Sequence, residues 1–286
     1  MKQLTVISGK GGTGKTSITA SFAVLAKNVI MADCDVDAPD LHMLIHPDVI
    51  KTQEFIGSKL AVIDKAKCTG CGLCRENCNF SAVTSDLDVN LIACEGCGVC
   101  KVVCPVGAIN LAPRLSGKAF ISKTKNGFMS HALLYPGESN SGKLVTLVRQ
   151  NAKILAGKES TGLIIIDGSP GIGCPVIASI TGVDAALVIT EPTMSGIHDL
   201  ERVLKLLDHF NVAPFVCINM YNVNTGNTNK ILSFCKENRV DVVGIIPFSP
   251  EVTRAMVDGK TIVEYSPKSG VAREIGNMWN KLSEFL

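Results

Sequence analysis

Short, nearly continuous apolar runs alternate with longer amphipathic segments along most of the chain. Such runs are typical of parallel strands covered on both faces, and the amphipathic segments between them are typical of helices. The pattern therefore predicts an α/β fold with a mainly parallel sheet flanked by helices. The expected strands are Leu4–Ser8, Val29–Asp33, Leu163–Asp167, Ala185–Thr190, Phe215–Asn219 and Val242–Ile246. The expected helices are Lys15–Lys27, Gly142–Ala156, Gly196–Phe210, Thr228–Asn238 and Ser249–Asp258.

This alternation is interrupted in the first half of the chain. A cysteine-rich block occupies residues 61–112, and two short apolar segments after it flank Asn126-Gly127, which is typical of a two-residue hairpin turn. We therefore expect two domains. Residues 1–60 and 113–286 form the larger one, and residues 61–112 form a small α+β module inserted into it.

Eight of the twelve cysteines lie in this block, as two copies of one spacing. The runs are Cys68-x-x-Cys71-x-x-Cys74-x-x-x-Cys78 and Cys94-x-x-Cys97-x-x-Cys100-x-x-x-Cys104. A zinc site usually joins two Cys-x-x-Cys pairs around one metal, whereas three close cysteines plus a remote fourth, present twice, match bacterial ferredoxins with two [4Fe–4S] clusters. There, the fourth cysteine of each run binds the other cluster. We therefore expect one cluster on Cys68, Cys71, Cys74 and Cys104, and the other on Cys94, Cys97, Cys100 and Cys78.

The two runs differ at the residue after the last cysteine. Asn79 follows Cys78, and Pro105 follows Cys104. Because proline has no N–H group, hydrogen bonding near the sulfur is expected to differ between the two sites. Such a difference would change the reduction potential of a cluster without preventing its binding.

A glycine-rich loop follows the first expected strand: Gly9-Lys10-Gly11-Gly12-Thr13-Gly14-Lys15-Thr16, with Ser17 after it. Its glycines, with Asp33 and Asp35 about 20 residues on, also fit a dinucleotide site. Lys15-Thr16 decides against that alternative, because a triphosphate site needs a lysine at the β- and γ-phosphates and a hydroxyl on Mg²⁺. Asp167 ends a buried strand and can hold the magnesium shell together with Thr16. Gly9 to Ser17 are therefore expected to bind nucleotide phosphates.

Lys10 makes this loop resemble the deviant phosphate loop of the MinD/Mrp/nitrogenase-iron-protein class of ATPases. The resemblance implies that Lys10 reaches across a homodimer to the partner's nucleotide. Asp33–Asp40 resembles switch I of that class, and Asp167–Gly173 resembles switch II. This likeness implies that Asp35 orients the attacking water and that Asp33 lies near the magnesium shell.

The resemblance extends to the second half of the chain. Asn219 matches the residue that reads adenine in this class, and Pro247 matches the residue beside the base. Glu138–Leu144 and Thr190–Asp199 resemble the subgroup of MinD-superfamily ATPases that carry an inserted ferredoxin domain. No chemistry is assigned to these two segments.

Composition narrows the possible partners. The net charge is +2, no run is rich in Lys or Arg, and aromatic residues make up 5% of the chain, so a nucleic-acid-binding face is not indicated. No apolar run approaches the roughly 18 residues of a membrane span, and no export signal is evident, so a cytoplasmic protein with metal-bound thiolates is expected.

An apolar helical stripe near the C-terminus, with balanced charges, is expected to close the core rather than bind lipid. It comprises Val271, Ile275, Met278 or Trp279, Leu282 and Phe285.

Together these features predict a cytoplasmic Mg-ATP hydrolase that couples nucleotide state to electron transfer through two [4Fe–4S] clusters. Its expected partners are ATP, a second copy of the chain and a redox protein. An iron–sulfur assembly ATPase of the Mrp type is one alternative, although no cysteine follows Cys235, where that branch carries a Cys-x-x-Cys. A partition or positioning ATPase that binds DNA or membrane is another, which the near-neutral charge disfavours. The expected catalytic residues are Lys10, Lys15 and Asp35, and the expected magnesium residues are Thr16, Asp33 and Asp167.

Overall fold

The computed structural model describes residues 1–138 and 141–286, and the chain divides into two compact units. Each unit has its own hydrophobic core. The expected cysteine module, residues 61–112, lies within unit 2. Unit 1 comprises residues 1–53, 119–133 and 141–286, and unit 2 comprises residues 54–118 and 134–140.

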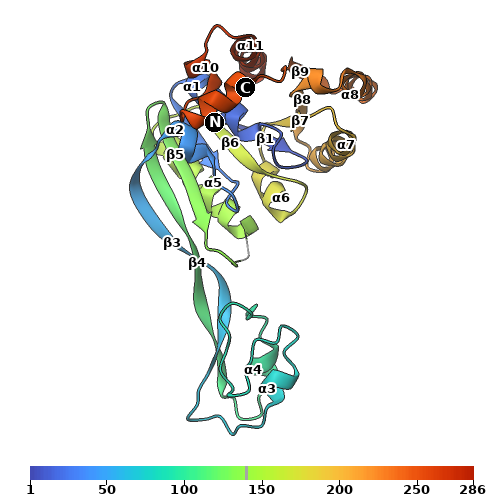
Figure 1. Cartoon of the computed structure of the whole chain (residues 1–286). Helices are drawn as coiled ribbons and strands as arrows, with labels where there is room; N and C mark the ends of the chain where they lie inside the picture. The colour runs from blue at the N-terminus through green and yellow to red at the C-terminus, as the bar shows by residue number, and fades with distance from the viewer. Residues whose placement is uncertain (139–140) are drawn as a thin grey trace. The chain divides into compact units, whose positions relative to one another are not determined.

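Unit 1 is built on parallel strands, which confirms the α/β pattern of the sequence (Figure 1). Over the described residues the sheet has nine strands in the order β3-β4-β5-β2-β6-β1-β7-β8-β9, and those from β5 to β9 in that order pair in parallel. The central strands are almost entirely buried because helices cover both faces. The expected strands are present as β1 (Lys2–Ser8), β2 (Val29–Asp33), β6 (Leu163–Pro170), β7 (Ala185–Thr190), β8 (Ala213–Ile218) and β9 (Asp241–Ile245).

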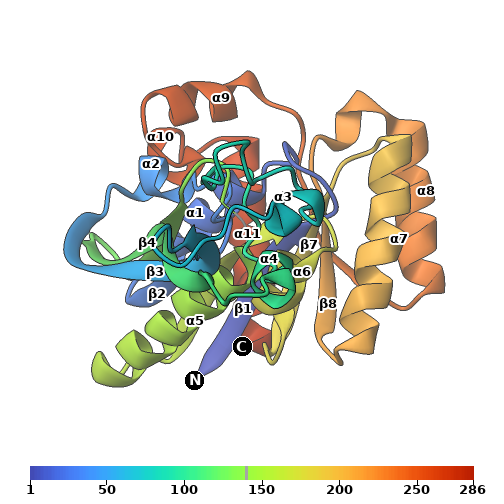
Figure 2. The ribbon, with the colours of Figure 1, turned by 90° about the horizontal axis from the view of Figure 1, so that it is seen from below.

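Helices form a layer on each face of the parallel strands, as Figure 1 and Figure 2 show. Within the layers, α1 contacts α2, α10 and α11, whereas α5 contacts α6, and α7 lies beside α8. One layer holds α1 (Lys15–Ala26), α2 (Leu41–Ile45), α9 (Pro250–Val257), α10 (Ile262–Tyr265) and α11 (Gly270–Phe285). The other holds α5 (Ser141–Lys158), α6 (Cys174–Ile180), α7 (Met194–His209) and α8 (Thr225–Glu237), with a single 3-10 turn, η1 (Tyr221–Val223), after β8.

The C-terminal stripe packs into the core of unit 1 as the sequence predicts, except at Phe285, which is exposed. Helix α11 contacts α1 and β9, and the Trp279 ring lies 5.2 Å from the Phe22 ring of α1, centroid to centroid. Within the part of the chain that the structure describes, no helix combines the length and the apolar character needed to span a bilayer. The buried positions of the stripe are Val271, Ile275, Met278, Trp279 and Leu282.

Two long strands, β3 (Asp48–Ile63) and β4 (Ile109–Thr124), have residues in both units. The sequence pattern does not predict β3, because most of its side chains are exposed. Strands β4 and β5 (Gly127–Leu134) are joined by a two-residue turn, but the prediction of Asn126-Gly127 as that turn is wrong by one position: the turn is Lys125-Asn126. Gly127 instead begins β5 as the register partner of Val29 on β2, and a Cβ there would lie 2.1 Å from the Val29 carbonyl oxygen.

Each cysteine run of unit 2 contains a short helix, α3 (Leu73–Glu76) in the first and α4 (Val99–Val103) in the second. Each begins after a glycine in the left-handed region, Gly72 with φ of 79° and Gly98 with φ of 83°. The core of this unit is small, and cysteine side chains form part of it. Its buried residues are Ala61, Cys74, Val83 and Ile109, with Cys78, Cys94, Cys100 and Cys104 packed against them.

Candidate functional site

The carboxyl ends of the central strands carry the acidic residues that the sequence singles out. Asp33 on β2 and Asp167 on β6 are register partners, and Asp167 also pairs with Val6 on β1. The glycine loop directly follows β1, so it leaves the sheet at the same edge. In open α/β sheets, ligands bind outside the carboxyl ends of the strands. The strand register therefore brings the loop and both carboxylates together.

Asp167 is the centre of a buried polar cluster at the start of α1. Its Oδ1 atom accepts hydrogen bonds from Lys15 Nζ at 2.9 Å and from Thr19 Oγ1 at 3.0 Å, and its Oδ2 atom accepts one from Thr16 Oγ1 at 2.8 Å. Asp35 Oδ2 lies 3.5 Å from the same Lys15 ammonium. The structure therefore gathers four of the expected residues and adds Thr19. The sequence offered a weak signal for Thr19, one helical turn after Lys15.

The charges in this cluster control one another's protonation. Burial alone would lower the pKa of Lys15, but the charges of Asp167, Asp35 and Asp33 together hold it above its usual value. Burial raises the pKa of Asp33 well above its usual range, and the charge of Asp167 raises it further. Burial also raises the pKa of Asp35. The three carboxyls outnumber the one buried ammonium, so a bound divalent cation would be stabilised here.

A cavity of about 620 Å³ adjoins this cluster, in the size range of ligand pockets. Its polar wall includes Gly11 to Ser17, Asp35 and Asp37, and its apolar wall comes from α9, α10 and α11. Two of the buried oxygens that have no partner among the described residues belong to this region: Thr13 Oγ1, on the cavity wall, and Asp33 Oδ2, on the strand end beside Asp167. Because unpaired buried oxygens cost free energy, both are suited to a ligand. This donor set fits a nucleotide with Mg²⁺.

Asn219 and Pro247 both line the same cavity, just after β8 and β9. Asn219 Nδ2 donates to the Thr13 carbonyl oxygen at 2.8 Å, so this amide supports the glycine loop. A Cβ at Gly14, where φ is 87°, would lie 2.5 Å from that nitrogen. Adenine reading by Asn219 stays a prediction, because in this structure its N–H₂ group is bonded to the loop. Apolar side chains beside Pro247, including Phe248, offer a flat base a surface.

The two switch-like segments are hydrogen-bonded to each other. Ser169 Oγ donates to the Cys34 carbonyl at 2.7 Å, and Cys34 N donates to the Asp167 carbonyl at 2.8 Å. Gly171 N donates to the Ser8 carbonyl, also at 2.8 Å. A displacement of either segment therefore changes contacts of the other.

Lys10 is not among the residues that line the cavity. Its ammonium group forms an ion pair with Glu191 and donates to Thr193 Oγ1 at 3.3 Å and to Ser195 Oγ at 3.2 Å. The segment to which the sequence assigned no chemistry, Thr190–Asp199, thus holds the lysine of the glycine loop. Sequence reasoning missed this role because the contact joins positions 181 residues apart.

Comparison with known proteins shows the family. The CobQ/CobB/MinD/ParA nucleotide-binding domain matches residues 4–262. The chain belongs to this family. An uncharacterised protein of Methanocaldococcus jannaschii is 34% identical over 99% of this chain and 97% of its own length. The septum site-determining protein MinD of Bacillus subtilis is 24% identical over 91% of this chain and 81% of its own length.

Solved structures share the fold. The cell division ATPase MinD of Pyrococcus furiosus matches with a TM-score of 0.60 at 17% identity, covering 100% of this chain and 99% of that one. MinD of Pyrococcus horikoshii, solved with Mg-ADP, matches with a TM-score of 0.59 at 15% identity, covering 99% and 96%. As a CobQ/CobB/MinD/ParA protein, the chain is an ATP-binding P-loop ATPase, and its cavity fits Mg²⁺ with the nucleotide.

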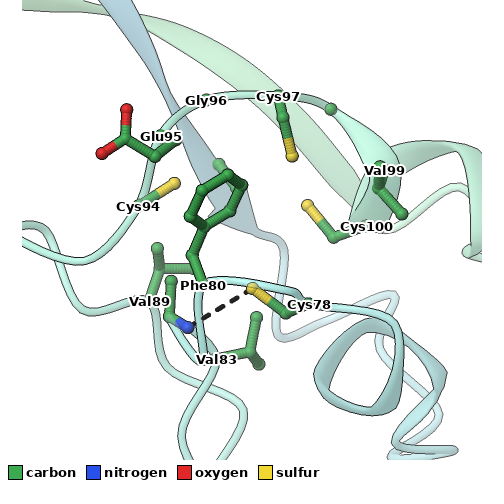
Figure 3. Close-up of a pocket in the computed structure, with 13 residues that line it drawn as sticks. Cys78, Phe80, Val83, Val89, Cys94, Glu95, Gly96, Cys97, Val99 and Cys100 are labelled. Atoms are coloured by element: carbon green, nitrogen blue, oxygen red, sulfur yellow. Dashed lines mark hydrogen bonds between the residues drawn. The ribbon is translucent and has the colours of Figure 1, made fainter. Parts of the chain in front are cut away.

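In this MinD/ParA-type ATPase the clustered cysteines form two sets of four, each around its own cavity in unit 2. Figure 3 shows the sulfur atoms of one set turned toward the space between them, beside the ring of Phe80. Each cavity takes three cysteines from one run and the last cysteine from the other. One is lined by Cys78, Cys94, Cys97 and Cys100, and the other by Cys68, Cys71, Cys74 and Cys104.

The donor chemistry of each set fits a cluster of several irons. Among the described His, Cys, Asp and Glu side chains, no three come together at a point that could hold a single metal ion. Four thiolates around a cavity suit a [4Fe–4S] cluster, because each sulfur binds a different iron. Burial raises the pKa of the Cys74 and Cys100 thiols, which favours their neutral form.

The last cysteine of each run, Cys78 or Cys104, accepts the same kind of hydrogen bond. Ala82 N donates to Cys78 Sγ at 3.3 Å, and Ala108 N donates to Cys104 Sγ at 3.3 Å. The prediction that Pro105 makes the two sites differ here is wrong. The donor is the fourth residue after the cysteine, not the next one, so the proline removes no hydrogen bond.

Proposed function

We propose that this ATPase couples its nucleotide state to electron transfer through two [4Fe–4S] clusters. The observation that carries the proposal is the grouping of eight cysteines into two sets of four, each around one cavity. When bound, such clusters supply one-electron transfer. Cys68, Cys71, Cys74 and Cys104 would hold one cluster, and Cys78, Cys94, Cys97 and Cys100 would hold the other.

The protein's own contribution at these sites is to hold the thiolates, donate hydrogen bonds to sulfur and limit water. The amides of Ala82 and Ala108 supply the hydrogen bonds, which stabilise added negative charge. Phe80 and Val83 line one cavity, and Leu87 lines the other. The hydrogen-bond donors and the apolar lining would together favour clusters that stay bound and carry electrons.

At the nucleotide site the charges suit hydrolysis of a bound triphosphate. Lys15 stays charged beside Asp167, so it is ready to exchange that partner for the β- and γ-phosphates. Thr16 and Asp167 would then hold Mg²⁺, with the unpaired Asp33 oxygen in its outer shell. Asp35, on the cavity wall, would orient the attacking water.

A homodimer is part of the proposal, in line with the likeness to the nitrogenase-iron-protein class. Lys10 would contact the partner's nucleotide, for which it must leave Glu191. Loss of the γ-phosphate would release the switch segments, whose mutual hydrogen bonds pass through Ser169 and Cys34. The nucleotide state would thereby alter how the chain meets a redox partner protein.

Relatives favour a second candidate, a positioning ATPase. Curated relatives include septum site-determining proteins, and similar structures include a ParA-family ATPase of Chlorobium tepidum. This role does not account for eight cysteines around two cavities. Salt-sensitive binding to DNA or to anionic liposomes would support it. An iron–sulfur carrier role of the Mrp type would instead show rapid transfer of iron to an apo-acceptor.

Anaerobic purification followed by iron, sulfide and zinc analysis tests the proposal. We expect about eight irons and about eight sulfides per chain, retained during incubation with an apo-ferredoxin acceptor. About two zincs per chain, with no sulfide, would contradict the electron-transfer function.

A further inference from the structure

The two cysteine sites are built on the same backbone frame. Cys68 N donates to the Asp64 carbonyl at 3.0 Å, and Cys94 N donates to the Asn90 carbonyl at 3.1 Å. The side-chain oxygens of Asp64 and Asn90 then accept from the amide two residues further on, at 3.0 Å and 2.9 Å. The amides that donate to the fourth cysteines also match. The backbone hydrogen bonds of the two sites therefore match, whereas the charges around the sites differ.

Among the residues that the structure describes, a cation of low exposure lies at the Cys94 loop and not at the Cys68 loop. Arg114 of β4 donates from Nη1 to the Cys94 carbonyl at 3.3 Å, and its second Nη forms an ion pair with Glu138. The Arg114 side chain is 15% exposed and that of Glu138 is 6% exposed. Charges with so little exposure are screened much less by water and salt than surface charges are. Arg114 bonds the Cys94 loop directly with one terminal nitrogen and pairs with Glu138 through the other.

Other charges near the sites are solvated. Glu95 follows Cys94, but it is exposed, and Figure 3 shows its carboxylate directed away from the four sulfur atoms. At the Cys68 loop, Lys65 and Lys67 are 54% and 63% exposed, and each pairs with an aspartate. That loop also carries the acid Asp64 where the Cys94 loop carries neutral Asn90. Exposed pairs contribute little, so the asymmetry is set by Arg114.

We propose that Arg114 makes the site of Cys78, Cys94, Cys97 and Cys100 the higher-potential of the two. The inference rests on the proposed function. An electron that the redox partner gives to either site adds one negative charge and no proton, and a cation of low exposure stabilises that charge. The positive charge of Arg114 stabilises the reduced form of this site, and the negative charge of Glu138 partly offsets that stabilisation. An electron accepted by the chain therefore rests at the Arg114 side.

A potentiometric titration of the anaerobic protein, followed by electron paramagnetic resonance, tests this. Arg114→Met is expected to lower the higher of the two midpoint potentials and leave the lower one in place. Glu138→Gln removes the offsetting charge and is expected to raise the same midpoint. Lys101→Met, which removes an exposed cation next to Cys100, is the matched control and is expected to shift neither by as much.

The opposite signs separate charge from structure, because mere loosening of the site would move the midpoint in the same direction in both variants. Movement of the lower midpoint in Arg114→Met, or a shift no larger than that of Lys101→Met, overturns the inference. An unchanged or lowered higher midpoint in Glu138→Gln also overturns the inference. This second test remains usable even if Arg114→Met fails to fold. A wild-type chain that holds no iron contradicts the proposed function itself, whereas an iron-loaded chain with unmoved midpoints contradicts only this inference.

Discussion

The double variant Cys68→Ser/Cys104→Ser is expected to keep about four irons per chain, whereas Cys68→Ser/Cys78→Ser is expected to keep almost none. The reason is the crossed grouping of the cysteines. Cys68 and Cys104 line one cavity, so their joint loss empties one site, but Cys68 and Cys78 line different cavities. Iron and sulfide analysis of anaerobically purified protein measures the result.

The control is Cys174→Ser, which changes an exposed cysteine of unit 1 outside both sets and is expected to keep about eight irons. If each run of four held its own cluster, the two double variants would exchange their outcomes. Equal iron loss in both, with normal iron in the control, would mean that the two sites are not independent.

Lys15→Met is expected to lower the rate of ATP hydrolysis by about 100- to 1,000-fold, the size of effect seen when one preorganised donor to transition-state charge is removed. Lys15 is buried, bonded to Asp167 at 2.9 Å, and lies on the wall of the nucleotide cavity. Its loss also leaves Asp167 and Asp35 without their cation. Steady-state phosphate release measures the change.

Lys27→Met is the matched control, because Lys27 is an exposed lysine at the end of the same helix, and its rate is expected to stay within about 2-fold of wild type. Thermal unfolding checks that Lys15→Met is folded. A folded Lys15→Met variant with an undiminished rate would contradict the role assigned to the glycine loop.

The parallel strands could be predicted because their apolar runs are continuous, which is what burial on both faces requires. Strand β3 could not, because most of its side chains are exposed and leave no pattern. The Asn-Gly pattern predicts the hairpin turn one residue late, because Asn-Gly usually forms the turn itself, whereas here Gly127 pairs with Val29 on β2. That close approach joins positions far apart in the chain, so no local signal reports it.

The functional sites likewise contain residues that the sequence predicts and residues that it does not. Lys15, Thr16 and Asp167 belong to motifs whose chemistry fixes the residue types, and the structure places them in contact. Glu191 lies in a segment to which the sequence assigns no chemistry, and Arg114 belongs to no motif. Their roles depend on contacts with Lys10 and with the Cys94 carbonyl, which only the folded chain brings together.

The coupling of nucleotide to electron transfer is tested most directly by the midpoint potentials of the iron-loaded protein, measured without nucleotide, with Mg-ADP and with Mg and a non-hydrolysable ATP analogue. We expect at least one midpoint to differ between the ADP and ATP-analogue states, and we expect Lys15→Met to abolish that difference. Identical midpoints in all three states, together with an electron-transfer rate that no nucleotide changes, would contradict the account.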